Sequence, residues 1–185
     1  MFLLAVRCIK RKGGVLYTPR MNAEKQLLLL RHAKSEWSGE PVIDLERPLS
    51  ARGREDAPRM GRWIAANDCV PEVAVVSPSA RTLETLELLC AELPAPPEII
   101  RERGLYHGGA AQIRAAAAAH LARSSRVLVL AHNPGMEAAL LEYCPDTPPF
   151  ADGKLMPTCA LAVIDLNSGR AARGNLRKLL RPSSL

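Results

Sequence analysis

The sequence predicts a single-domain α/β fold, a three-layer α/β/α sandwich whose sheet is mostly parallel. Short apolar segments alternate along the chain with longer segments of helical periodicity, which is typical of a parallel sheet covered on both faces. The length of 185 residues suits one domain. Because no internal repeat marks a second domain, we expect one domain over residues 27–185.

The first strand organises the rest of the chain. Residues 27–30 are four leucines, too few for a buried helix, and predict a short strand buried on both faces. Arg31 and His32 follow this strand directly. Residues 36–48 are polar and rich in glycine and proline, so we expect a loop above the strand ends.

A second strand–helix unit follows. Ser50 is a suitable N-cap for an amphipathic helix that extends to about residue 67. Pro58 falls inside this helix and predicts either a kink or a helix that becomes regular only after it. Residues 73–77 predict a second buried strand, and residues 78–93 predict the helix that follows it.

The later part of the chain repeats this alternation. Residues 98–100 predict a short strand, residues 110–123 an alanine-rich helix and residues 127–131 a buried strand. His132 follows that strand at once and precedes a helix that extends to about Tyr143.

The C-terminal part predicts an antiparallel hairpin after a proline-rich loop at 145–157. Residues 159–165 and 174–180 form its two strands, with a turn at 167–169.

The composition argues against several classes of protein. No apolar segment approaches the roughly 18 residues that a membrane span needs, so we expect no membrane partner. The cysteines are odd in number, scattered and without a C-x-x-C pair, which argues against a disulfide framework and a zinc site. We therefore expect a reduced, cytoplasmic protein. The five cysteines are Cys8, Cys69, Cys90, Cys144 and Cys159.

The net charge of +6 is concentrated at the N-terminus. Residues 1–26 hold six basic residues and one acidic residue, a net charge of +5, so the rest of the chain is nearly neutral. This distribution argues against a nucleic-acid partner. We expect residues 1–26 to be a basic leader, either mobile or the result of a misassigned start, since Met21 could begin the chain.

Charged or titratable groups follow three of the predicted strands. They are Arg31 with His32, then Arg81, then His132. The carboxyl ends of parallel strands share one edge of a sheet, so these side chains could converge there. Two guanidiniums and two imidazoles would suit an anion, because the arginine fork binds phosphate oxygens in pairs. The alternative is that Arg31 and His32 are only the polar end of a core strand.

The sequence resembles the histidine phosphatase superfamily, and within it the small SixA-type phosphohistidine phosphatases. The similarity extends from about residue 27 to residue 180. It implies a phosphoglycerate-mutase-like α/β sandwich without the larger cap insertions of bigger members. Four segments carry it: Leu30-Arg31-His32-Ala33-Lys34-Ser35, residues 44–53 (DLERPLSARG), residues 77–85 (SPSARTLET) and Ala131-His132-Asn133-Pro134.

The resemblance implies roles for individual residues. His32 would be the nucleophile that becomes phosphorylated, and Arg31 and Arg81 would hold the phosphoryl oxygens. His132 would donate a hydrogen bond to the transferring group. Arg47 would be a further phosphate-side arginine, although a loop residue in a salt bridge is an equal alternative.

Further predictions concern the substrate and its surroundings. Ser35, which follows the Arg-His segment, is a substrate-binding candidate. Trp37, close behind, would either wall the pocket or anchor its loop. We expect no cofactor and no metal, since arginines and imidazoles supply the positive charge.

Two features depart from the family pattern. Ala33 stands where the superfamily usually has glycine, which predicts a slightly less open backbone with the same chemistry. Larger members also have a carboxylic acid after the third strand that protonates the leaving group. Glu102 and His107 are the candidates for that acid here, and neither aligns clearly.

The sequence therefore predicts a metal-independent phosphatase that works through a phosphohistidine intermediate. The favoured substrate is phosphohistidine on a protein partner in signalling. The alternatives are a phosphatase of small metabolite monoesters and a non-catalytic phosphate-binding module.

Overall fold

The computed structural model describes residues 25–37, 43–166 and 173–185. The predicted leader, apart from Lys25 and Gln26, and the predicted turn at 167–169 lie outside the described residues. The strands are β1 (Lys25–Arg31), β2 (Val73–Val76), β3 (Glu98–Arg101), β4 (Arg126–Ala131), β5 (Leu161–Leu166) and β6 (Gly174–Leu180). The α-helices are α1 (Ala51–Ala66), α2 (Ala80–Cys90), α3 (Ala110–Leu121) and α4 (Gly135–Tyr143).

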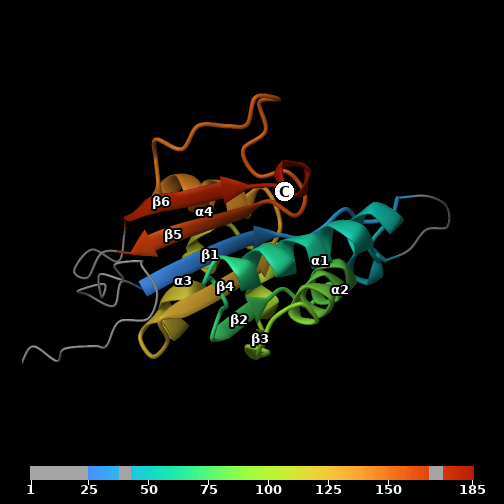
Figure 1. Ribbon diagram of the computed structural model, residues 1–185, viewed down its shortest axis with the longest axis horizontal. Helices are drawn as coiled ribbons and strands as arrows, with labels where there is room; N and C mark the ends of the chain where they lie inside the picture. Colours follow the sequence, from blue (N-terminus) through green and yellow to red (C-terminus); the bar gives the residue numbers. More distant parts are fainter. Residues whose placement is uncertain (1–24, 38–42, 167–172) are drawn as a thin grey trace, which may run out of the picture.

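All six strands form one sheet in the order β3-β2-β4-β1-β5-β6 (Figure 1). Strands β1 to β4 are parallel to one another, whereas β5 is antiparallel to β1 and to β6. The predicted parallel sheet with an antiparallel C-terminal hairpin is confirmed. Strand β4 lies between β1 and β2, so the chain reverses its direction across the sheet at the β1–β4 pair. Ligands of open α/β sheets bind at such a reversal.

The sheet buries a separate apolar core on each face. Alternate residues of one strand point to opposite faces, so the four leucines of β1 divide between the two cores. Leu27 and Leu29 pack with α3 and α4, and Leu28 and Leu30 pack with α1 and α2. All four are fully buried, which explains why the strand is apolar without alternation. Figure 1 shows the two helix pairs on opposite faces of the sheet.

Element boundaries differ from the prediction in ways that the backbone explains. Helix α1 is continuous through Pro58, so the expectation of a helix regular only after that residue is wrong. Ser50 caps α1 as predicted, because its Oγ accepts a hydrogen bond from the backbone N–H of Gly53. Strand β5 begins at Leu161, two residues later than predicted, since Cys159 has a φ of 59°, outside the extended region.

Short 3₁₀-helices, which the sequence analysis did not predict, follow strands β1 and β3. They are η1 (Asp44–Glu46) and η2 (Arg103–Leu105), and a third, η3 (Pro182–Ser184), follows β6. Helix η1 interrupts the expected loop at 36–48 and carries an acidic side chain in its first position. Together η1 and η2 bring extra polar side chains to the carboxyl edge of the sheet.

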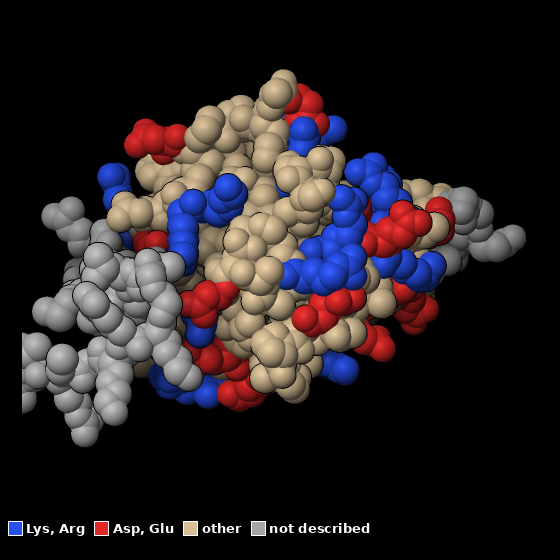
Figure 2. Space-filling view, viewed as in Figure 1, with Lys and Arg blue, Asp and Glu red and all other residues tan. Residues whose placement is uncertain are grey.

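Basic and acidic side chains are mixed over the face that Figure 2 shows. Ion pairs join α1 to α2 and to the turn after it, namely Arg54 with Glu84 at 2.6 Å and Arg62 with Glu92 at 2.8 Å. These exposed pairs each contribute at most about 1 kcal/mol to stability. Within the described ranges, no helix combines the length and the apolar character that crossing a membrane would require.

The start of α1 packs directly on the backbone that follows β1. A Cβ atom at Gly53 would overlap the carbonyl oxygen of Lys34, so Gly53→Ala must push α1 away from the segment that carries His32. We expect this substitution to lower the free energy of unfolding by about 1–3 kcal/mol, measured by urea denaturation. Gly109→Ala is the control, because its Cβ would lie 3.7 Å from its nearest neighbour. Equal stability of the two variants would contradict this account.

Candidate active site

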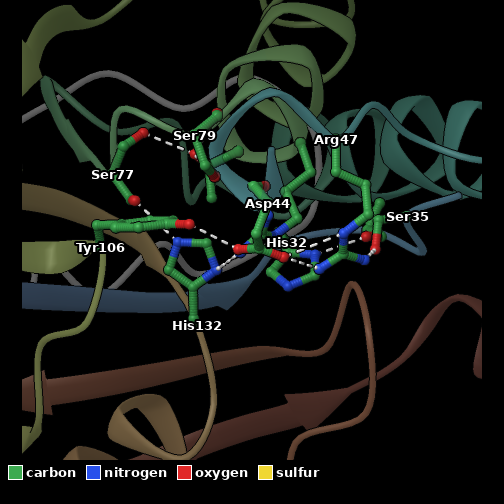
Figure 3. Close-up of polar contacts among 11 residues, drawn as sticks. His32, Ser35, Asp44, Arg47, Ser77, Ser79, Tyr106 and His132 are labelled. Atoms are coloured by element: carbon green, nitrogen blue, oxygen red, sulfur yellow. Dashed lines mark hydrogen bonds and ion pairs between the residues drawn. The ribbon is translucent and has the colours of Figure 1, made fainter. Parts of the chain in front are cut away.

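Strand register brings the ends of β1, β2 and β4 together. Arg31 is the partner of Ala131 in the β1–β4 pair, so the next residues, His32 and His132, leave the sheet side by side. Their ring centroids lie 5.1 Å apart. Ser77 follows β2 in the same way, and its Oγ lies 2.8 Å from Nε2 of His132 (Figure 3). The predicted convergence of residues far apart in the sequence is therefore present.

The imidazole of His32 is held in one tautomer. Its Nδ1 lies 2.7 Å from the carbonyl oxygen of Ala33, and because a carbonyl can only accept, Nδ1 must carry the proton. The Nε2 of the neutral ring is then left with a free lone pair. The backbone of His32 is also fixed, since its N–H donates to Ala131 and its carbonyl accepts from Cys159.

Burial keeps both imidazoles neutral. It is the main cause that lowers the pKa of His32 from 6.5 to about 3, with smaller contributions from the charges of His132, Arg81 and Arg31. Burial likewise lowers the pKa of His132 from 6.5 to about 4, and the charge of Arg81 adds to the effect. A neutral His32 is the form that can act as a nucleophile.

Arg81 lies in the first turn of α2 and is almost fully buried. Its Nη1 donates to the backbone carbonyl of Asp44 at 2.6 Å, and its Nη2 donates to Oδ2 of Asp44 at 3.0 Å and to Nδ1 of His132 at 3.4 Å. Thr85 ties this turn to β1, since its hydroxyl accepts from the N–H of Ala33 and donates to the carbonyl of Arg81. The guanidinium is thus fixed beside both imidazoles.

Asp44 joins the polar groups of the site, and the sequence analysis gave it no role. Its carboxylate accepts hydrogen bonds from Tyr106 at 2.6 Å, from Arg47 at 2.6 Å and from Arg81 (Figure 3). The Tyr106 hydroxyl, followed by the two arginines, holds the pKa of this carboxyl well below its usual range. The only signal in the sequence was its position one turn before Arg47.

Of the remaining predicted phosphate-side residues, Arg47 and Ser35 join this group, and Arg31 has a different partner. Arg47 also donates to the hydroxyl of Ser35, and its guanidinium lies 4.0 Å from the ring centroid of Trp37. Trp37 itself is 76% exposed, so it does not anchor its loop in the core. The Nη1 of Arg31 donates to the carbonyl of Met156 at 2.8 Å, and its buried Nε has no partner among the described residues.

Comparison with known proteins finds relatives of this chain. The model of the histidine phosphatase superfamily (branch 1) matches residues 27–106. The phosphohistidine phosphatase SixA of Escherichia coli is 27% identical over 165 residues, which cover 86% of this chain and 96% of that protein. An uncharacterised chloroplastic protein of Arabidopsis thaliana is 33% identical over 76 residues, 41% of this chain, and this chain spans about a third (35%) of its length.

Solved structures share the fold. The protein histidine phosphatase SixA complexed with tungstate superimposes with a TM-score of 0.73 at 24% identity, covering 86% of this chain and 98% of that chain. The chain is therefore similar to the histidine phosphatase superfamily over residues 27–106 and to SixA over most of its length. It is therefore a hydrolase of the phosphatase class.

The two candidates for the general acid, Glu102 and His107, lie at different distances from the site. The carboxylate of Glu102 accepts from the N–H of Gly104 at 2.9 Å, so it caps η2 instead of joining the group around Asp44. The His107 ring lies 4.0 Å from that of Tyr106, and its charge contributes to the lowered pKa of His132. Of the two, only His107 lies close to the site.

Ala33 occupies the position where the superfamily usually has glycine. It is fully buried, and its N–H donates to Thr85 at 3.1 Å. Its carbonyl still accepts from His32, so the methyl group leaves the tautomer of the imidazole unchanged.

The lowered pKa values can be tested by NMR titration of the histidine rings. We expect His32 and His132 of the folded protein to titrate near pH 4 or below, with His32→Ala and His132→Ala assigning the signals. The unfolded chain binds these protons near pH 6.5. The free energy of unfolding should therefore decrease as the pH falls below 6.5. A midpoint near 6.5 for His32 in the folded protein would contradict the proposed burial effect.

Proposed function

We propose that this protein is a histidine phosphatase that removes the phosphoryl group from phosphohistidine on a protein partner, without a metal ion, through a phosphorylated His32. The observation that carries the proposal is the fixed tautomer of His32. Its Nδ1 proton is committed to Ala33, and its lowered pKa leaves Nε2 unprotonated. An unprotonated nitrogen at the carboxyl edge of the sheet, flanked by arginines, suits attack on phosphorus.

In the first step Nε2 of His32 attacks phosphorus, a P–N bond to His32 forms and the P–N bond to the substrate imidazole breaks. Arg31 and Arg81 bind the phosphoryl oxygens, with Arg47 beside them. Phosphoryl transfer has a loose transition state, so catalysis consists mainly of placing the groups and stabilising their charge. The leaving imidazole takes its proton from solvent.

In the second step water attacks the phosphorus on His32, which releases inorganic phosphate and restores the free ring. His132 would stabilise the oxygens in both steps. In the free enzyme its Nδ1 accepts from Arg81. The Ser77 hydroxyl can either donate to Nε2 of His132 or accept from it. When it donates to Nε2, Nδ1 can carry the ring proton and donate it to a phosphoryl oxygen bound beside Arg81.

The carboxyl groups of the loops around the site support phosphohistidine as the substrate, and His107 is left as the one acid candidate that a substitution must test. Asp44 is ionised because its pKa is held low, and Glu102 is used as a helix cap, so neither is a ready proton donor. An imidazole leaving group needs a positioned acid less than an alkoxide does. One-turn helices η1 and η2, not a helical lid, border this site in the described part of the chain.

The name of one relative supports phosphohistidine as the substrate. The curated relative of E. coli bears the name phosphohistidine phosphatase. We propose that the present protein acts in the cytoplasm in a signalling relay and that residues 1–20 are dispensable for its activity, whereas Lys25 and Gln26 belong to β1.

His32→Ala should abolish turnover and leave the fold intact, because the imidazole faces the site and not the apolar cores. The wild type, mixed with substrate and quenched in alkali, should carry acid-labile phosphate, whereas the variant should carry none. His120→Ala is the matched control, since His120 lies on α3 outside the site and its ring nitrogen contacts only Arg123 among the described residues. Retention of most activity by His32→Ala would disprove the covalent mechanism.

Arg81→Lys should lower kcat as well as raise KM, because its bonds to the phosphoryl oxygens strengthen in the transition state. Loss of a preorganised donor in a comparable site costs about 3 kcal/mol. Steady-state kinetics of this variant and of Arg31→Lys measure the effect, with the exposed Arg62→Lys as control. A change confined to KM would mean uniform binding and would refute the assigned role.

The leaving group distinguishes this proposal from a phosphatase of metabolite monoesters. Without a positioned acid, phosphoramidates and aryl phosphates should be cleaved faster than alkyl phosphates by about 10²–10⁴-fold. Glu102→Gln and His107→Ala should then matter little for a phosphohistidine substrate. Equal rates for alkyl and aryl esters, lost selectively in one of these variants, would favour the metabolite function instead.

A further inference from the structure

A second polar cavity lies beside the candidate active site. It has a volume of about 300 Å³ and is formed by the segment after β1, the start of α1, the loop before β5 and the end of β6. Arg31 is one of its lining residues, so the cavity adjoins the residue that precedes His32. Of its lining residues, the proposed mechanism and the family resemblance use only Arg31.

Positive charge predominates among its lining residues. Five of the described residues that line it are basic, and one is acidic: Arg31, Lys34, Arg52, Lys154 and Arg181, with Asp152. Asp152 accepts from Arg181 at 2.8 Å and from Lys154 at 3.4 Å. Arg52 has its own partner in Asp56, at 3.3 Å.

The basic groups keep donors that no carboxylate satisfies. The Nε atoms of Arg31 and Arg181 are buried and have no hydrogen-bond partner among the described residues. Among the described residues, the side chain of Arg31 makes one hydrogen bond, to the carbonyl of Met156. The guanidinium of Arg181 is also held in place, 4.6 Å from the ring centroid of Phe150. Like charges fixed close together with spare donors make a site for an additional anion.

We propose that this cavity is an anion subsite that binds an acidic side chain of the phosphorylated protein, next to its phosphohistidine. The inference rests on the proposed function for the class of substrate. Arg31 borders both sites, so it links the phosphoryl group to the second anion. Binding there would favour phosphohistidines that have an Asp or Glu nearby, and it would weaken as salt screens the charges.

Paired phosphohistidine peptides test the proposal. Each pair differs only in Glu against Gln at one position, and the positions flanking the phosphohistidine are scanned in turn. At low ionic strength we expect the wild type to prefer Glu at one or more positions by about fivefold in kcat/KM, the size of one exposed ion pair. Lys154→Gln and Arg181→Gln should lose this preference and keep their turnover of the Gln peptides. Lys154 is exposed, so its variant is not expected to disturb the fold.

Arg62→Gln is the control, because Arg62 pairs with Glu92 on the α1–α2 surface. If the wild type hydrolyses the peptides with no preference for Glu, or if the preference persists in both cavity variants, the subsite is wrong. If no peptide is hydrolysed, the proposed function fails. The subsite is then tested with aryl phosphates as substrates. A preference for a carboxylated aryl phosphate that Lys154→Gln removes would support the subsite, and its absence would overturn it.

Discussion

The parallel pairing of β1 with β4 is the constraint on which the site depends. Its register sets Arg31 opposite Ala131, so the two histidines that follow emerge as neighbours. The burial of the apolar residues of both strands fixes that register, because a slip by one residue would exchange the side chains between the two cores. The apolar leucines of β1 therefore act on the chemistry indirectly, by determining where His32 leaves the sheet.

Electrostatics then determine what the two imidazoles can do. Burial beside Arg81 makes a proton on either ring unfavourable, so the His32 ring stays neutral over the ordinary pH range, which is the form that the proposed nucleophile needs. Asp44 supplies the opposing charge and holds Arg81 and Arg47 on one carboxylate. This arrangement explains how cationic side chains stay ordered near one another in the free enzyme.

Two groups of basic side chains lie near this edge of the sheet, and they differ in burial and in partners. Arg81 is almost fully buried and is bound by Asp44 and His132, as suits a group that stabilises a transition state. Lys154 and Arg181 lie farther along, share one carboxylate and border a cavity that also reaches Arg31. Basic side chains that lie near the reacting groups without contacting them are suited to selecting the substrate.

The sequence alone determined the α/β class, the strand–helix order and the family resemblance, because apolar periodicity and the four motif segments are local in the chain. It also identified Arg31, His32, Arg81 and His132 as residues that follow strands. Only the tertiary structure decided that Asp44, Tyr106 and Ser77 join them, that Glu102 caps η2, and that a basic cavity adjoins Arg31. These contacts join loops far apart in the chain, and their partners depend on sheet order and on turns such as η1, which no local pattern specifies.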